Sequence, residues 1–266
     1  MAFDFHKNKQ VYFEHQYLNS KNFILPFIEA NFPITEGMKV LEVGCAEGGV
    51  LKAFTERGCI TTGVELSEER TELAKDFLIQ EMEAGKISFI NKNIYDDSFK
   101  SDFKGEFDLI IFKDVIEHIH DQKKLVAYLN IFLKPNGKIF FGFPPWYMPF
   151  GGHQQMCANK ILSKLPYYHL LPMFLYKMIL KMGGESEQKI ANMAEIKDTG
   201  ISIERFESIV KRTGYDVVNK THFLFNPIYR YKFKIEPRKQ SPLIQIFPYF
   251  RDFFTTCVYY LIEVKK

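Results

Sequence analysis

The segment Val40–Gly49 reads Val-Leu-Glu-Val-Gly-Cys-Ala-Glu-Gly-Gly, so a short apolar run gives way to a turn of small residues. A second strand-like stretch, Thr62–Val64, ends in Glu65 just before a helix start. In a β-α-β unit that binds a nucleoside, an acidic residue follows a glycine turn by about 20 residues. The turn lets the backbone approach the ligand, and the acid takes two ribose hydroxyls. These two features predict a nucleoside-binding α/β protein.

Strands and helices alternate on either side of this unit. Apolar strands are expected at Lys39–Val43, Ile60–Val64, Ile87–Ile90, Phe107–Phe112 and Lys138–Phe143, with helices or a polar loop (Asn91–Lys104) between them. Such alternation predicts an α/β, doubly wound and mostly parallel sheet whose ligands bind beyond the carboxyl ends of its strands. A helix near 203–213 and strands near 216–225 and 256–264 would complete a seven-stranded, Rossmann-like sheet.

The chain is expected to form one domain over residues 1–266. Helices in 1–35 precede a ligand-binding core in 36–145, and C-terminal strands in 201–266 complete the sheet. Between them, residues 145–200 are rich in Tyr, Met, Leu and Lys and read as a helical insert that covers the acceptor side of the sheet.

Composition limits the function and location. The net charge of the 266 residues is only +3, so no nucleic-acid partner is expected. The four cysteines are scattered, no His or Cys spacing suits zinc, and no metal site is expected. Residues 1–10 lack the apolar region of a secretion signal, and no apolar run reaches the ~18 residues of a membrane span. These features predict a soluble, cytoplasmic protein with reduced cysteines.

An ordered set of motifs across residues 36–145 resembles class I S-adenosylmethionine-dependent methyltransferases. The motifs are Glu42-Val-Gly-Cys-Ala-Glu-Gly48, Glu65, Asn93-Ile94, the stretch Phe107–His118, and Leu133-Lys-Pro-Asn-Gly-Lys138. The Asp-x-x-Glu-His sequence at 114–118 is similar to the small-molecule branch that includes the ubiquinone-pathway enzymes. The resemblance implies methyl transfer with S-adenosyl-L-methionine as cofactor.

The resemblance also assigns cofactor-binding residues. Glu42 would hold the methionyl amino group, while Gly44, Cys45, Ala46 and Gly48 would pass under the methionine and ribose. The other implied contacts are Glu65 to both ribose hydroxyls, Leu66 and Ile94 around the adenine, Asn93 at its amino edge, and the backbone of Lys113. Ala46 replaces the middle glycine of the family, which a methyl group allows if its φ stays negative. The Lys113 side chain is expected to point away from the sulfonium.

Two histidines are candidate catalytic residues. His153 follows a Pro- and aromatic-rich segment where an acceptor would approach, and histidine titrates near neutral pH, so it could take a proton from a hydroxyl. It could equally orient the insert through Gln154 or Gln155. His118 could act in catalysis or simply pack at the base of the loop after the fourth strand.

The insert carries an apolar face over residues 161–182 that is flanked by lysines. This pattern favours a helical lid over an apolar acceptor pocket, with peripheral membrane contact as the alternative. The predicted function is methyl transfer to a small or lipid-like acceptor, with oxygen as the favoured atom. A noncatalytic S-adenosylmethionine-binding module remains an alternative, as does a nicotinamide oxidoreductase, which Ala46 at the second glycine of the dinucleotide fingerprint disfavours. The acceptor and the oligomeric state stay open.

Overall fold

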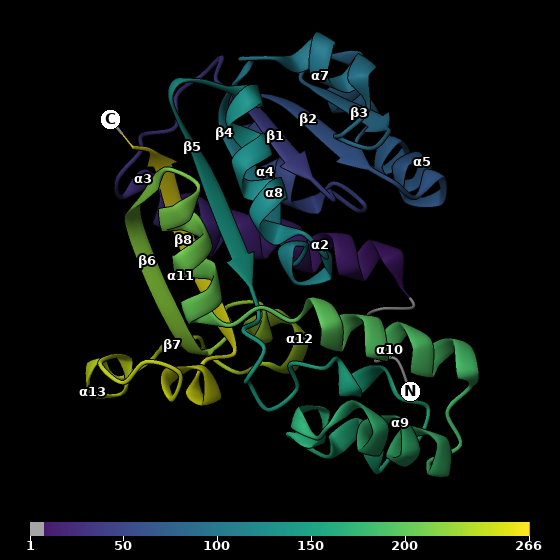
Figure 1. The fold of residues 1–266 in the computed structure, drawn as a ribbon. Helices are drawn as coiled ribbons and strands as arrows, with labels where there is room; N and C mark the ends of the chain where they lie inside the picture. The colour runs from purple at the N-terminus through teal and green to yellow at the C-terminus, as the bar shows by residue number, and fades with distance from the viewer. Residues whose placement is uncertain (1–7, 266) are drawn as a thin grey trace.

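A twisted eight-stranded sheet forms the centre of the molecule in the computed structural model, which describes residues 8–265 (Figure 1). Its strand order is β3-β2-β1-β4-β5-β8-β6-β7. The strands are β1 (Lys39–Val43), β2 (Ile60–Glu65), β3 (Ile87–Asn91), β4 (Phe107–Lys113), β5 (Leu133–Phe143), β6 (Tyr215–Phe225), β7 (Arg238–Lys239) and β8 (Cys257–Val264). The strands β1 to β5 pair in parallel, whereas β8, β6 and β7 add in antiparallel fashion.

The predicted doubly wound, Rossmann-like fold is confirmed, with one correction to the number of strands. The two-residue strand β7 pairs with β6 at the sheet edge through Lys239 and Arg238, so the sheet has eight strands rather than seven. Residues 1–7, which make up most of the segment assessed for a secretion signal, lie outside the described residues.

Helices cover both faces of the sheet, because the strands are apolar on both sides. One face carries the N-terminal helices and the helices that follow β1 and β2, namely α2 (Lys9–Asn19), a π-helical turn (Ser20–Ile24), α3 (Leu25–Glu29), α4 (Gly49–Glu56), α5 (Glu68–Phe77) and α6 (Ile79–Glu83). The other face carries α7 (Asp97–Phe103), α8 (Gln122–Leu129) and α11 (Ile203–Arg212). Each face packs its own apolar core, and Figure 1 shows α8 and α11 on the near side of the strands.

Local signals explain several boundaries and one difference from expectation. The Ser67 hydroxyl caps α5 by accepting from the Arg70 N–H, and Gly58 ends α4 with a φ of 83°. Residues 91–104, expected to form a polar loop, contain the short helix α7, which forms because Phe99 buries completely in the core. The turn expected at 134–137 is a bulge within β5, where the pairing with β4 shifts register.

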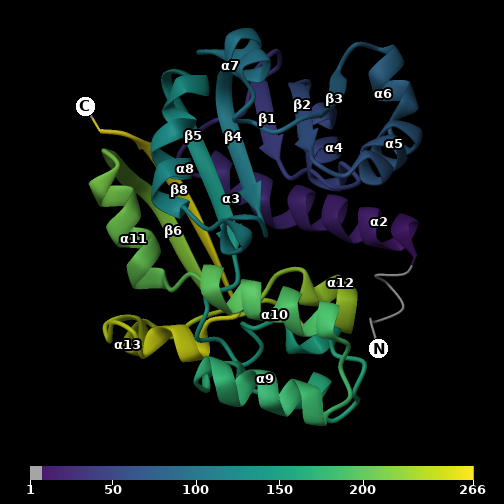
Figure 2. The same ribbon diagram turned by 45° about the vertical axis from the view of Figure 1, so that its right-hand side comes forward.

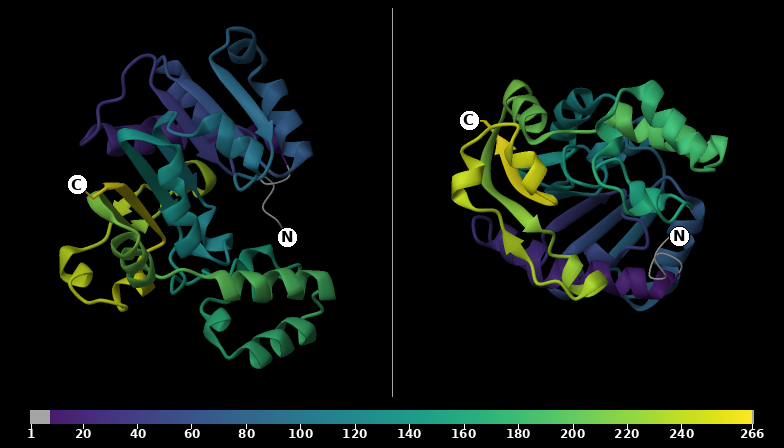
Figure 3. Two further views of the ribbon diagram at one scale, coloured as in Figure 1. Left: turned by 45° about the horizontal axis from the view of Figure 1, so that its top comes forward. Right: turned by 90° about the horizontal axis from the view of Figure 1, so that it is seen from below.

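The insert between β5 and α11 lies beyond the carboxyl ends of the parallel strands (Figures 2 and 3). Residues 145–172 form turns and short 3₁₀ segments, so the expectation of a fully helical insert is wrong for its first half. Pro166 and Pro172 interrupt helix formation there. Its second half contains α9 (Met173–Met182) and α10 (Glu187–Thr199), which share a small core of Cys157, Leu162, Tyr168, Tyr176, Leu180 and Met193.

The remaining elements are short. The helices α12 (Tyr229–Phe233) and α13 (Pro242–Gln245) lie between the C-terminal strands. All four cysteines are buried free thiols. Over the described range 8–265, the helices are too short or too polar to span a bilayer.

Candidate functional site

A pocket of about 440 Å³, part of which is open solvent, lies where β1 and β4 end. The helix α2 forms one wall, and the glycine-containing turn after β1 forms another. The lining residues are Tyr12, Phe13, Gln16, Glu42, Gly44, Cys45, Ala46, Glu47, Gly49, Val50, Arg70, Lys113 and Asp114. The cavity therefore lies at the sheet edge where an open α/β sheet binds its ligands.

The turn after β1 holds its backbone in left-handed conformations. Gly44 has a φ of 71°, and a Cβ there would lie 2.6 Å from a Val115 methyl group. Gly48 has a φ of 80°. Ala46 has a φ of 47°, so the condition under which a methyl group is tolerated without strain, a negative φ, is not met. The Ala46 methyl group therefore sits in a strained conformation at the cavity wall, which a glycine would occupy without strain.

Helix α2 is held tightly against this turn. A Cβ on Gly49 would lie 2.5 Å from the Phe13 carbonyl oxygen, so only glycine allows the helix to approach this closely. The Lys9 ammonium group lies 2.8 Å from a carboxylate oxygen of Glu47, whose side chain is buried. These contacts hold α2 in place as the wall that covers the cavity. The turn was predicted from the sequence, whereas no site residue was predicted in α2.

Glu42 and Lys113 are two buried ionisable residues on neighbouring strands that line this cavity. Glu42 is 2% exposed, and its Oε2 atom has no hydrogen-bond donor among residues 8–265. Burial raises the pKa of Glu42 well above its usual value, although the positive charge of Lys113 opposes that rise. Such a carboxyl group suits an ammonium ligand that would supply the missing charge and donors.

The Lys113 side chain is buried beside the cavity. It is 5% exposed and forms an ion pair with Asp114, and both residues line the cavity. That the side chain points away from a bound sulfonium stays a prediction. Burial alone would lower the pKa of Lys113, but the Asp114 carboxylate outweighs burial and raises it. The lysine is therefore charged at neutral pH. The sequence could not show that α2 would close this face and trap the side chain.

Glu65, at the end of β2, joins two loops. One carboxylate oxygen accepts from the Leu66 and Ser67 N–H groups at 2.9 and 3.0 Å, and the other accepts from the Ala46 N–H at 3.0 Å. A carboxylate has about four lone-pair sites. One site, on the oxygen that faces Ala46, is therefore not used by these three N–H groups. The contact of Glu65 with both ribose hydroxyls stays a prediction.

The remaining predicted cofactor residues lie beyond the enclosed cavity. Leu66 is 70% exposed and Asn93 is exposed, whereas Ile94 is buried. Gly48 lies at the start of α4, where a Cβ would meet the Phe89 ring at 2.8 Å. Except for Gly48, the residues predicted to contact the methionine thus line the cavity, whereas those predicted to contact the adenine do not.

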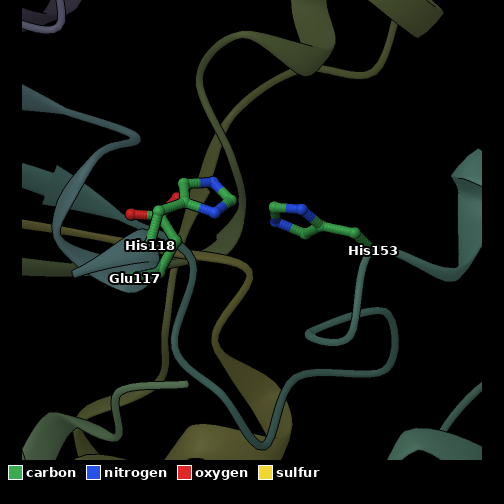
Figure 4. Close-up of side chains that lie close together, drawn as sticks. All are labelled: Glu117, His118 and His153. Carbon is green, nitrogen blue, oxygen red and sulfur yellow. The ribbon is translucent and has the colours of Figure 1, made fainter. Parts of the chain in front are cut away.

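The two candidate catalytic histidines come together. His118 ends a 3₁₀ turn (Ile116–His118) after β4, and His153 lies in the insert with a φ of 55°. Their ring centroids are 5.1 Å apart, and Figure 4 shows the rings facing each other. Burial, together with the nearby His118, lowers the pKa of His153 to about 4. His153 is therefore neutral at pH 7 and does not titrate there, contrary to expectation.

A buried hydrogen-bond network fixes the turn that carries His153. The His169 ring is fully buried; its Nδ1 atom lies 2.6 Å from the Gln154 side-chain nitrogen, and its Nε2 atom lies 2.9 Å from the Trp146 carbonyl oxygen. Gln154 can only donate here and the carbonyl can only accept, so Nδ1 accepts and Nε2 carries the proton. Gln154, rather than His153, thus anchors this part of the insert.

The sheet topology and the cavity at its carboxyl edge define the class: a class I methyltransferase fold. The chain belongs to the methyltransferase-domain family, whose model matches residues 13–170. The predicted class, S-adenosylmethionine-dependent methyltransferases, is confirmed by this membership.

Similar proteins agree with this assignment. The ubiquinone biosynthesis O-methyltransferase of Idiomarina loihiensis is 34% identical over 117 residues, which cover 44% of this chain and 46% of that protein. The chain thus spans about half the length of the curated relatives it matches. The Haemonchus contortus phosphoethanolamine N-methyltransferase 2 structure, solved with phosphomonomethylethanolamine and S-adenosylhomocysteine, has a TM-score of 0.56 at 18% identity over 92% of this chain and 52% of that one. A putative sarcosine dimethylglycine methyltransferase from Galdieria sulphuraria has a TM-score of 0.58 at 13% identity, over 92% of this chain and 85% of that one.

Proposed function

We propose that the protein transfers a methyl group from S-adenosylmethionine to a hydroxyl oxygen of a small or lipid-like acceptor. The observation that carries this proposal is the cavity beside the left-handed turn, with the unpaired, buried carboxyl of Glu42 at its wall. When bound, S-adenosylmethionine would supply a methyl group on a positively charged sulfur; the products would be S-adenosylhomocysteine and the methyl ether, and the hydroxyl proton would pass to solvent water.

The residues of the cavity fit that cofactor. Glu42 would accept hydrogen bonds from the methionyl ammonium group, and the turn at 44–48 would support the chain between methionine and ribose. Glu65 would accept from one ribose hydroxyl through its free lone-pair site. The exposed side chains of Leu66 and Asn93, with the buried Ile94, would border the adenine at the open end.

The acceptor side of the site is proposed to lie between the end of β4 and the insert. His118 and His153 lie together there, with their rings in an edge-on contact. Methylation at oxygen is supported by the name of the curated relatives, which are O-methyltransferases. A neutral His153 can accept a hydrogen bond from an acceptor hydroxyl and orient its oxygen toward the methyl group.

A lipid-like acceptor is favoured by the surface of the insert. Ile161, Phe174 and Met182 are large apolar side chains that are 76%, 70% and 80% exposed. Exposed lysines surround them at 160, 164, 177 and 181. Apolar side chains flanked by lysines suit contact with an anionic membrane surface. We propose that the insert both covers the acceptor and makes this peripheral contact.

The test measures cofactor binding and methyl transfer separately. Calorimetry with S-adenosylhomocysteine should show one binding site, whereas NADH should not bind. Transfer of a labelled methyl group to hydroxylated aromatic or lipid acceptors should then follow. Binding of S-adenosylhomocysteine without transfer to any acceptor would favour a noncatalytic module, and binding of NADH alone would overturn the proposal.

A further inference from the structure

Glu117, His118 and His153 form a cluster that the proposed function does not explain. Glu117 and His118 lie in the 3₁₀ turn after β4, and His153 reaches them from the insert (Figure 4). We propose that these three side chains bind a divalent transition-metal cation, such as Zn²⁺, beside the acceptor. This inference rests on the proposed function for its role but not for the binding itself.

The geometry allows a single ion to contact all three side chains. One ring nitrogen of each histidine and one oxygen of Glu117 all lie within 4.8 Å of one another. Imidazole and carboxylate ligands bind zinc at about 2.0–2.2 Å in a tetrahedral arrangement, so two ligand atoms of one ion are about 3.4 Å apart. Small side-chain rotations would therefore close the site around an ion.

Glu117 supplies an independent indication of a missing ligand. The side chain is 4% exposed, and its Oε2 atom has no hydrogen-bond donor among residues 8–265. The nearby Asp114 carboxylate makes the surroundings more negative. A buried carboxyl oxygen without a donor is costly, even though the positive charge of Lys113 lies near this group. A cation between Glu117 and the two histidines would provide the coordination that the Oε2 atom lacks.

The backbone holds the cluster in place at both ends. Asp114 and His153 adopt left-handed conformations with φ of 56° and 55°, which are uncommon for residues other than glycine. Strained residues of this kind concentrate at functional sites. The network of Gln154 and His169 fixes the turn after His153, and His118 remains exposed, so an ion can enter from solvent.

Two imidazoles and one carboxylate leave coordination positions open for another ligand. The cluster also adjoins the cofactor site, since Val115 contacts Gly44 and lies two residues before Glu117. An acceptor hydroxyl that binds the ion would have a lower pKa, and its proton would pass to solvent water. The acceptor class that fits is therefore a hydroxylated compound that binds the ion through oxygen.

Titration of the chelator-treated, dialysed full chain with Co²⁺ or Zn²⁺ tests the inference. We expect one site by calorimetry, with visible absorption bands on Co²⁺ addition, and at least tenfold weaker binding by His153→Ala and Glu117→Gln. His118→Ala changes an exposed position and keeps the test decisive if a buried variant does not fold. The matched control is His120→Ala, because His120 is exposed on the same loop and contacts Glu195 instead.

Equal metal affinity in the wild type, His153→Ala and His118→Ala would overturn the inference, as would no one-site binding by the wild type. The affinity for S-adenosylhomocysteine is measured on the same samples. Intact cofactor binding with no metal binding would refute the metal site alone, whereas metal binding without cofactor binding would refute the proposed function alone.

Discussion

The substitution Glu65→Ala tests the cofactor site most directly. The carboxylate already accepts three backbone N–H groups, which leaves about one lone-pair site for a ribose hydroxyl. A hydrogen bond to a charged group contributes about 2 kcal/mol. Since about 1.4 kcal/mol corresponds to a factor of ten in affinity, the variant should bind S-adenosylhomocysteine about 30-fold more weakly.

Calorimetry measures this loss, and Glu69→Ala is the control, because Glu69 is exposed in the first turn of the following helix. The substitution at position 65 also releases the Ala46 N–H, so thermal unfolding without ligand must be compared between variants. Wild-type affinity in folded Glu65→Ala, or an equal loss in Glu69→Ala, would refute the assignment of Glu65 to the ribose.

Three further predictions concern strain, pH and the surface. Ala46→Gly should stabilise the protein by about 0.5–1 kcal/mol in urea unfolding. Glycine adopts the left-handed φ of 47° without strain, and this gain exceeds its larger loss of chain entropy on folding. A destabilised variant would contradict the strain at position 46. His169 has a folded pKa of about 4 because burial disfavours its charged form, whereas an unfolded histidine has about 6.5. Below pH 6.5 the unfolded state therefore binds more protons than the folded state. The free energy of unfolding should be highest above pH 6.5 and lower by up to about 2 kcal/mol at pH 5. Urea unfolding at both pH values should show a smaller fall in His169→Gln, and an unchanged pH dependence would exclude His169. The double variant Phe174→Ser and Met182→Ser should no longer sediment with anionic vesicles yet should bind S-adenosylhomocysteine like the wild type; retained sedimentation would exclude this surface.

Much of the fold could be predicted because its strands are continuous apolar runs. β4 is buried along almost its whole length, and the glycine turn after β1 marks the edge where ligands bind. The structure of the first half of the insert was harder to predict, because its apolar residues suit helices and 3₁₀ turns equally well. Pro166 and Pro172 favour the 3₁₀ turns that this segment forms.

The parts of the site that the sequence did not reveal depend on contacts between distant segments. The burial of Lys113 depends on α2, which covers this part of the sheet, and nothing near position 113 in the sequence predicts that contact. Glu117 and His153 are 36 positions apart, so a search for closely spaced metal ligands misses the cluster. The φ of Ala46 has no local signal, because alanine is more stable in other conformations.

The contact of α2 with the turn after β1 has a consequence for turnover. The Phe13 carbonyl rests on Gly49, and Lys9 pairs with Glu47, so the methionine end of a bound cofactor would be enclosed while its adenine end stayed open. We expect the spent cofactor to depart adenine first, or only after the N-terminal helix lifts. Release of the spent cofactor, rather than the chemical step, would then limit the rate of turnover as long as the Lys9–Glu47 ion pair holds that helix in place.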